Sequence, residues 1–215
     1  MNHAPLSSLV IAEAAKCIGC KACELACFAV HNRDNGVGTA VGTVTMPVLP
    51  RLYVIRTDSF TMPVQCRQCE NAPCAGACPV QAIRQEDGVI VIDAEACIGC
   101  KACALACPFG AISLYKAYSG GAELPQPLLQ ERRDSKLQRK TRIIAYKCDL
   151  CRNTEIPGGS APWEKETGNG DSSATAGQDR SSFPACVAVC PEQALRLVES
   201  GTGSSRSLNR EGMIF

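Results

Sequence analysis

The chain has few of the residues that usually build a large apolar core. Aromatic residues make up 5% of its 215 residues, and charged residues make up 20%. A core this thin for a chain of this length indicates that something besides apolar burial stabilises the fold. The sequence also lacks any uninterrupted apolar run of about 18 residues, so we expect no membrane span.

Signals for export, nucleotide binding and covalent catalysis are missing too. The N-terminal MNHAPLSSLVIAEAAKC has neither the basic start nor the long apolar stretch of a secretion signal. We find no glycine-rich Rossmann motif, no molybdopterin pocket signature and no nucleophile with a neighbouring base. A secreted disulfide scaffold and an independent enzyme are therefore disfavoured, and a reducing, cytoplasmic compartment is expected.

Cysteine is the residue type present in excess. The sixteen cysteines form four runs, and the clearest is C-x2-C-x2-C-x3-C-P at Cys97, Cys100, Cys103 and Cys107. In bacterial ferredoxins this run binds iron–sulfur clusters, and its fourth cysteine binds the neighbouring cluster. Zinc ribbons also use C-x2-C pairs, but they require neither the third cysteine at this spacing nor the C-P ending.

The other runs repeat this pattern with small departures. The sequence CIGCKACELAC of run one differs at one position from CIGCKACALAC of run three, and Phe28 replaces the proline after its fourth cysteine. Run two has two extra residues before its third cysteine, and run four is split by a 34-residue insert. Such an internal repeat indicates related cluster-binding units. These runs comprise Cys17, Cys20, Cys23 and Cys27; Cys66, Cys69, Cys74 and Cys78; and Cys148, Cys151, Cys186 and Cys190.

Short apolar segments between the runs predict strands at 8–12, 52–56 and 142–146. A hairpin of strands 82–84 and 89–92 is expected between runs two and three, because only eighteen residues separate their cysteines. Residues 117–140 lack apolar periodicity, so we expect an exposed connecting segment there.

We therefore expect an α+β fold of two pseudo-symmetric bacterial 2[4Fe-4S] ferredoxin-like modules, one nested inside the other. The short hairpin joins runs two and three in an inner module, residues 64–116. Runs one and four then pair in an outer module, residues 1–63 plus 141–199. The remaining segments are loops or inserts at 117–140 and 152–185 and a tail at 200–215.

With crossed fourth ligands, this nesting predicts four ligand sets. They are Cys17, Cys20, Cys23 with Cys190; Cys66, Cys69, Cys74 with Cys107; Cys97, Cys100, Cys103 with Cys78; and Cys148, Cys151, Cys186 with Cys27. The alternative pairs run one with two and run three with four, which would not use the short hairpin. His31 follows run one, but the four cysteines already present favour a loop histidine over a ligand.

Charge argues against a nucleic-acid partner. The formal net charge is +1, but sixteen thiolates and four oxidised clusters of about +2 each bring it to roughly −7. Basic residues beside the cysteines then compensate anionic clusters or form ordinary surface charges. These residues are Lys16, Lys21, Arg67, Lys101, Lys147 and Arg152.

The sequences CIGCKACELAC, CRQCENAPC (66–74) and KCDLC (147–151) resemble the four-cluster ferredoxin subunits of molybdenum or tungsten oxidoreductases. They are most similar to electron-transfer subunits of formate hydrogenlyase and formate dehydrogenase, over residues 8–116 and 141–198. The resemblance implies four [4Fe-4S] clusters that relay single electrons. The donor or acceptor would be a catalytic formate dehydrogenase, hydrogenase or aldehyde oxidoreductase subunit, paired with a second acceptor or another copy of the chain.

Two other functions remain open beside electron transfer. A maturation or scaffold protein would hold clusters for such an enzyme, and a DNA-associated cluster protein is disfavoured by the charge. Trp163 in the 152–185 insert is either part of a solvated loop or a docking anchor. The insert and the tail are the expected partner contacts.

Overall fold

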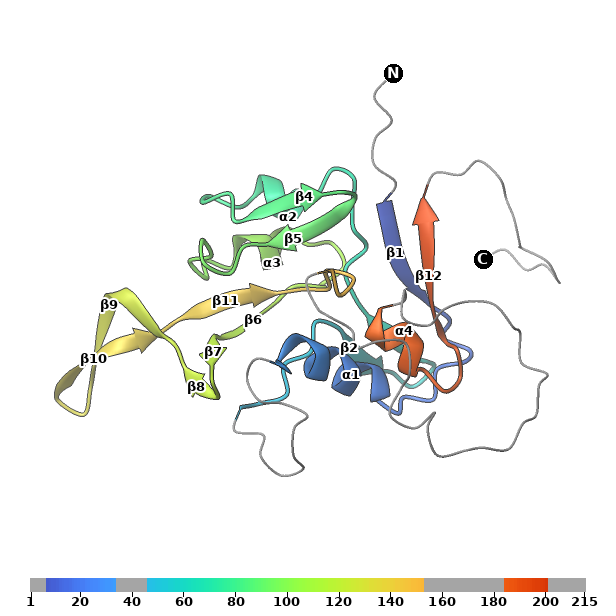
Figure 1. Ribbon diagram of the computed structural model, residues 1–215, viewed down its shortest axis with the longest axis horizontal. Coiled ribbons are helices and arrows are strands. Elements are labelled where there is room, and N and C mark those ends of the chain that lie inside the picture. Colours follow the sequence, from blue (N-terminus) through green and yellow to red (C-terminus); the bar gives the residue numbers. More distant parts are fainter. Residues whose placement is uncertain (1–6, 34–45, 153–183, 201–215) are drawn as a thin grey trace, which may run out of the picture.

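The computed structural model describes residues 7–33, 46–152 and 184–200. These residues form four short helices and six two-stranded antiparallel sheets (Figure 1). The combination of short helices and short strands agrees with the predicted ferredoxin-like α+β fold. Within the described ranges, no helix has the length and apolar character needed to span a membrane.

One group of elements surrounds the predicted hairpin. Strands β4 (Ile83–Glu86) and β5 (Val89–Ile92) pair directly, and helices α2 (Pro73–Gly76) and α3 (Ala102–Ala106) lie beside them (Figure 1). Strand β6 (Ser113–Lys116) leaves this group and pairs with β11 (Ile143–Tyr146). The hairpin and the strand at 142–146 were thus predicted correctly. The buried core of this group consists of Cys74, Ile83, Ile90, Cys103, Ile112 and Ala145.

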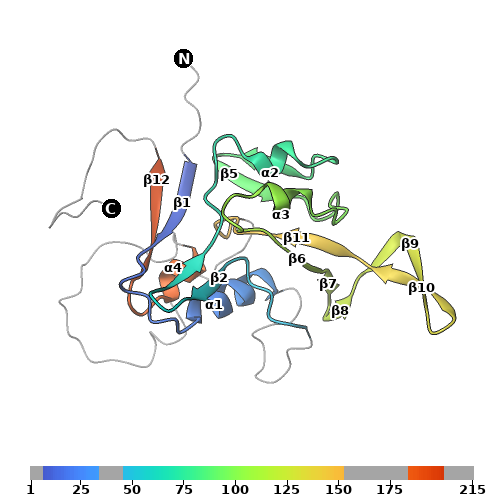
Figure 2. The ribbon, with the colours of Figure 1, turned by 180° about the vertical axis from the view of Figure 1, so that it is seen from behind.

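A second group joins the two ends of the described chain. Strand β1 (Ser7–Ala12) pairs along its whole length with β12 (Leu195–Ser200), and helices α1 (Ala22–His31) and α4 (Ala185–Val189) lie below them (Figures 1 and 2). Strand β2 (Tyr53–Arg56) pairs with β3 (Thr61–Val64) in the same region. The buried core of this second group consists of Val10, Cys23, Cys27, Leu52, Cys186 and Leu195.

Helix length in the cysteine runs depends on the residue after the fourth cysteine. Helix α3 ends at Ala106, and Cys107 has an extended backbone because the residue before a proline disfavours the helical conformation. Cys190 before Pro191 is extended in the same way after α4. Phe28 imposes no such limit, so α1 continues for ten residues through Cys27 to His31.

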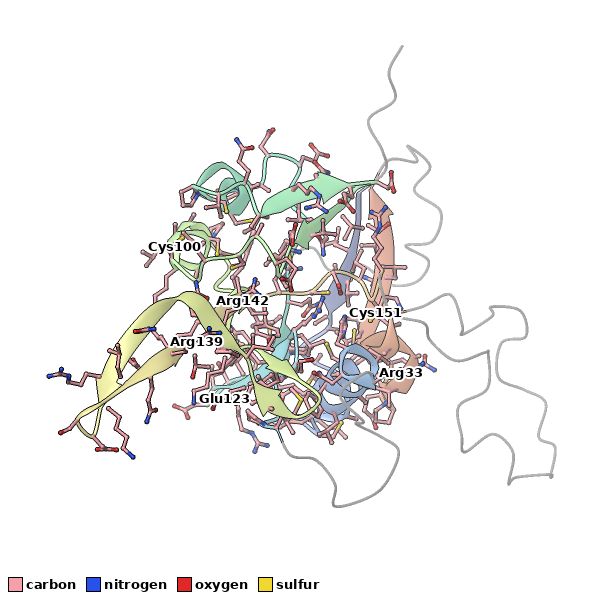
Figure 3. The ribbon with its side chains drawn as sticks, turned by 60° about the vertical axis from the view of Figure 1, so that its left-hand side comes forward. Arg33, Cys100, Glu123, Arg139, Arg142 and Cys151 are labelled. Carbon is pink, nitrogen blue, oxygen red and sulfur yellow. The ribbon has the colours of Figure 1, made fainter. Side chains whose placement is uncertain are left out.

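The segment 117–140 was predicted to be an exposed connecting loop; it is largely exposed, but it forms strands. The segment forms a small hairpin and a protruding two-stranded arm on which Arg139 lies (Figure 3). Its strands are β7 (Tyr118–Ser119), β8 (Ala122–Glu123), β9 (Pro125–Arg133) and β10 (Lys136–Thr141). Nearly all of β10 is exposed, so this strand has no buried face and its sequence needs no apolar alternation.

The insert that contains Trp163 and the C-terminal tail lie outside the described residues, as do residues 34–45.

Candidate iron–sulfur sites

All sixteen cysteines lie in the described part of the chain, and none forms a disulfide. We call the four predicted ligand sets the first to fourth sites, numbered by the run that supplies three of their cysteines. In the described ranges no three His, Cys, Asp or Glu side chains approach closely enough to hold one metal ion. What the cysteines surround instead is a set of cavities.

The first site lies where run one meets the end of run four. A cavity there is lined by all four of its predicted cysteines: Cys17, Cys20, Cys23 and Cys190. Pro63 of β3 and Leu195 of β12 complete the wall. The structure therefore brings together cysteines that are far apart in the sequence, from the first and the last run.

The cysteines predicted for the second and third sites line two further cavities. One cavity is lined by Cys66, Cys69, Cys74 and Cys107, and another by Cys97, Cys100, Cys103 and Cys78. The three cavities have similar volumes, about 360, 310 and 320 Å³ for the first, second and third sites. Three similar cavities with four cysteines each are suited to the same bound group.

The cysteines of the fourth site also lie near one another. Cys27 and Cys186 belong to the same buried core. Burial raises the pKa of the Cys186 thiol well above its ordinary value, and the neighbouring Cys148, Cys151 and Cys27 raise it further. Cys27, from the other end of the chain, is thus a neighbour of the run-four cysteines. Figure 3 shows Cys151 of this site well separated from Cys100 of the third site.

The chemistry of these thiols fits an iron–sulfur cluster. Burial raises the pKa of Cys23 and of Cys74 to about 11, and that of Cys27 to about 12. Without a nearby cation these thiols stay protonated at neutral pH, whereas coordination to a metal deprotonates a thiol outright. The apolar, four-cysteine sites are therefore suited to thiolates whose charge is balanced by iron.

Backbone N–H groups donate to the fourth cysteine of each run. After the C-P ending, the amide of the alanine four residues on donates to the sulfur: Ala82 to Cys78 (3.3 Å), Ala111 to Cys107 (3.4 Å) and Ala194 to Cys190 (3.3 Å). Such bonds tune the reduction potential of a cluster. The alanine of the repeated C-P-x-x-A motif thus supplies the amide that donates to the cysteine sulfur.

Run one lacks the proline, and its fourth cysteine obtains this bond differently. Because α1 continues past Cys27, no turn brings a local amide to the sulfur. The amide of Arg51 donates to Cys27 Sγ instead, at 3.2 Å. The same residue reaches Asp149 with its guanidinium.

His31 is not a loop histidine, so this prediction is wrong. It is the last residue of α1, and its side chain is only 5% exposed. Nε2 lies 2.9 Å from Asp149 Oδ1, and Nδ1 lies 2.8 Å from the carbonyl oxygen of Cys27. Both partners are hydrogen-bond acceptors, a backbone carbonyl and a carboxylate.

Asp149, between Cys148 and Cys151, connects α1 to the run-four loop. Its carboxylate accepts hydrogen bonds from His31, from Arg51 and from the amide of Cys151 at 3.1 Å. Burial would raise the pKa of this carboxyl, but the bond from His31 and the charge of Arg51 lower it to about 2. Asp149 is therefore an ionised, buried anchor beside the fourth site.

Four buried polar or charged residues lie next to cysteines, among the residues the structure describes. They are Gln65, Gln68, Lys147 and Asp149. Of the six basic residues predicted to compensate clusters, Lys147 alone is in this group, with its ammonium donating to the carbonyl oxygens of Ile90 and Cys148. Gln65, Gln68 and Asp149 were not singled out from the sequence, although a glutamine at 68, where runs one and three have glycine, was a visible signal.

The chain is similar to known iron–sulfur proteins over most of its length. Residues 57–120, which contain runs two and three, match the family model of the 4Fe-4S dicluster domain. An iron-sulfur protein of Rhodospirillum rubrum is 34% identical over 191 residues, covering 89% of this chain and 82% of the relative. The electron transport protein HydN of Escherichia coli (strain K12) is 32% identical over 194 residues, covering 90% and 89%. Formate hydrogenlyase subunit 2 of the same strain is 34% identical over 205 residues, covering 91% and 83%.

Proposed function

Since the chain belongs to the family of 4Fe-4S ferredoxin-type electron-transfer proteins, we propose that it carries four [4Fe-4S] clusters and relays single electrons without a substrate reaction of its own. One observation carries this proposal: three similar cavities are each lined by four cysteines drawn from two different runs. Four thiolates per cluster is the ligand number that [4Fe-4S] clusters require.

The proposed ligands are the sixteen cysteines in the four crossed sets, arranged in nested inner and outer modules. The two separate buried cores support the nesting, because one contains cysteines of runs two and three and the other contains cysteines of runs one and four. Pairing of run one with run two would leave Cys190, at the wall of the first site, without a role.

The clusters would then form a line in the order first, fourth, second, third. The first and fourth sites are neighbours because helix α1 supplies Cys23 to one and Cys27 to the other. The fourth and second sites are neighbours because Gln68, in the loop of run two, contacts the backbone of Cys148. The third site lies at the far end, next to the second in the inner core.

Both ends of this line are accessible. Cys20 and Cys100 are exposed. Each shares its cavity wall with an exposed isoleucine, Ile18 (58% exposed) in the first site and Ile98 (53%) in the third. Leu25 (57%) and Leu105 (88%) are exposed on the helices that follow, α1 and α3. Exposed apolar side chains of this kind favour protein docking. We propose a cytoplasmic catalytic oxidoreductase subunit, such as a hydrogenase or formate dehydrogenase, at one end and a second acceptor or another copy at the other.

Iron and sulfide analysis of anaerobically purified protein tests the proposal. We expect about sixteen of each, four per site, and reversible one-electron reduction of each cluster. Stoichiometric zinc without broad visible absorbance would overturn it. Transfer of whole clusters to an apo-enzyme, in place of electrons, would favour the maturation function instead.

A further inference from the structure

The third residue of each C-x2-C loop has a left-handed backbone. The φ angles are 71° at Gly19, 49° at Gln68, 67° at Gly99 and 58° at Leu150. Glycine adopts this conformation without steric cost, whereas other residues are disfavoured in it. Runs one and three follow this preference, whereas run two has Gln68 and run four has Leu150 at this position. Of these two residues, Gln68 has the polar side chain, which can form hydrogen bonds.

The side chain of Gln68 is buried and reaches across to run four. The residue is 1% exposed. Its Nε2 donates to the carbonyl oxygen of Cys148 at 3.0 Å, and its Oε1 accepts from the amide of Ile90 at 2.8 Å. The backbone amide of Gln68 donates to Cys66 Sγ at 3.4 Å. One residue thus links a sulfur of the second site to the backbone of a cysteine of the fourth site.

Lys147 also forms hydrogen bonds with Ile90 and Cys148. Its ammonium donates to the carbonyl oxygens of Cys148, at 2.7 Å, and of Ile90. Lys147 itself is 2% exposed. The junction between the two sites is therefore buried and is held by hydrogen bonds from both Gln68 and Lys147.

We propose that Gln68 is the positioning residue that fastens the run-two loop to the run-four loop and provides the bonded route for electrons between the two modules. This rests on the proposed function. In this step the reduced cluster of one site loses one electron, the oxidised cluster of the other gains it, and no covalent bond breaks. The route runs from Cys66 Sγ through the amide and side chain of Gln68 to the carbonyl and sulfur of Cys148.

The substitution Gln68→Gly tests this role while respecting the backbone. Runs one and three already have glycine here, and the amide that donates to Cys66 Sγ is retained. Gln81→Gly is the matched control, because Gln81 also has a left-handed backbone (φ 52°) but is exposed. In a freeze-quench experiment with substoichiometric dithionite, EPR follows how electrons redistribute among the clusters.

We expect Q68G to keep wild-type iron content and to redistribute electrons between the modules several-fold more slowly than Q81G. Hydrogen exchange of the segment that contains Ile90 should also rise, by roughly fivefold, because its amide loses an acceptor in a bond worth about 1 kcal/mol. If Q68G loses clusters, Gln68→Met preserves the size of the side chain without its hydrogen bonds and is expected to give the same slowing.

Equal redistribution rates in Q68G, Q68M and Q81G, each with full iron, would overturn the inference and leave the proposed function intact. A wild-type protein that binds no cluster would refute the proposed function itself. The inference would also fail if Q68G changed only the cluster potentials and left the redistribution rate unchanged.

Discussion

Replacing Asp149 by alanine is expected to make loss of the clusters much faster. The carboxylate is 9% exposed and accepts hydrogen bonds from three groups: the His31 ring, the Arg51 guanidinium and the Cys151 amide. These donors come from α1, from the segment before β2 and from the run-four loop. No other single side chain described above connects these three segments.

The burial of the Asp149 ion pair determines the expected free-energy cost of the substitution. Removing one partner of a buried ion pair costs about 3–5 kcal/mol, because the other charge stays buried and unpaired. We take the low end, about 3 kcal/mol, because the Arg51 side chain is 29% exposed and water compensates part of its charge. This corresponds to up to about a hundredfold in the rate of unfolding, if the network is lost in the transition state.

The assay is the decay of the cluster absorbance in guanidinium under anaerobic conditions. Cluster loss is irreversible, so a rate is measured and not an equilibrium. The control is Asp93→Ala. Asp93 also accepts from backbone amides beside a cysteine run, those of Glu95 (2.8 Å) and Ala96 (3.2 Å), but its side chain is 39% exposed. That loss should cost about 1 kcal/mol. Equal decay rates for D149A and D93A would refute the reasoning.

Three more changes have defined outcomes. Gly99→Ala should impair holoprotein yield, because the φ of 67° is left-handed and a Cβ would lie 2.5 Å from the Ile143 carbonyl oxygen, whereas Gly76→Ala meets no atom within 4 Å and should be neutral. Cys190→Ser should change the EPR signal of the first site and spare the fourth, and the reverse result would contradict the crossed ligands. Deletion of residues 157–182, which contain no cysteine, should preserve all four clusters by iron analysis but weaken co-purification with a catalytic subunit; full co-purification would place docking elsewhere.

Cysteine spacing predicted much of this molecule because ligand geometry is local. The turns around a cluster depend on two or three intervening residues, and only eighteen residues separate runs two and three, so the hairpin of β4 and β5 could be predicted. The strand β1 could be predicted from its apolar residues. The strand β10 of the protruding arm could not, because a strand without a buried face shows no apolar alternation.

The partners of the buried polar side chains could not be predicted from the sequence, even at position 68, where the glutamine itself is unusual. His31 and Asp149 are 118 residues apart, and Gln68 and Cys148 are 80 apart. A polar side chain near a cysteine run reads as a surface residue until its partner is known. Only the tertiary structure places that partner next to it.

The pairing of β1 with β12 has a consequence for how the protein is made. Ser7 pairs with Ser200, whereas Glu86 of β4 pairs with Val89 across a two-residue turn. During synthesis the N-terminal end of a chain emerges first, and distant pairings pay more loop-closure entropy than local ones. In the proposed ligand sets, all cysteines of the second and third sites are synthesised before Cys186 and Cys190. Until Cys190 is made, the first of these sets lacks its fourth cysteine. Delivery of iron and sulfide to the growing chain is therefore expected to begin in the middle of the sequence and to finish at its two ends.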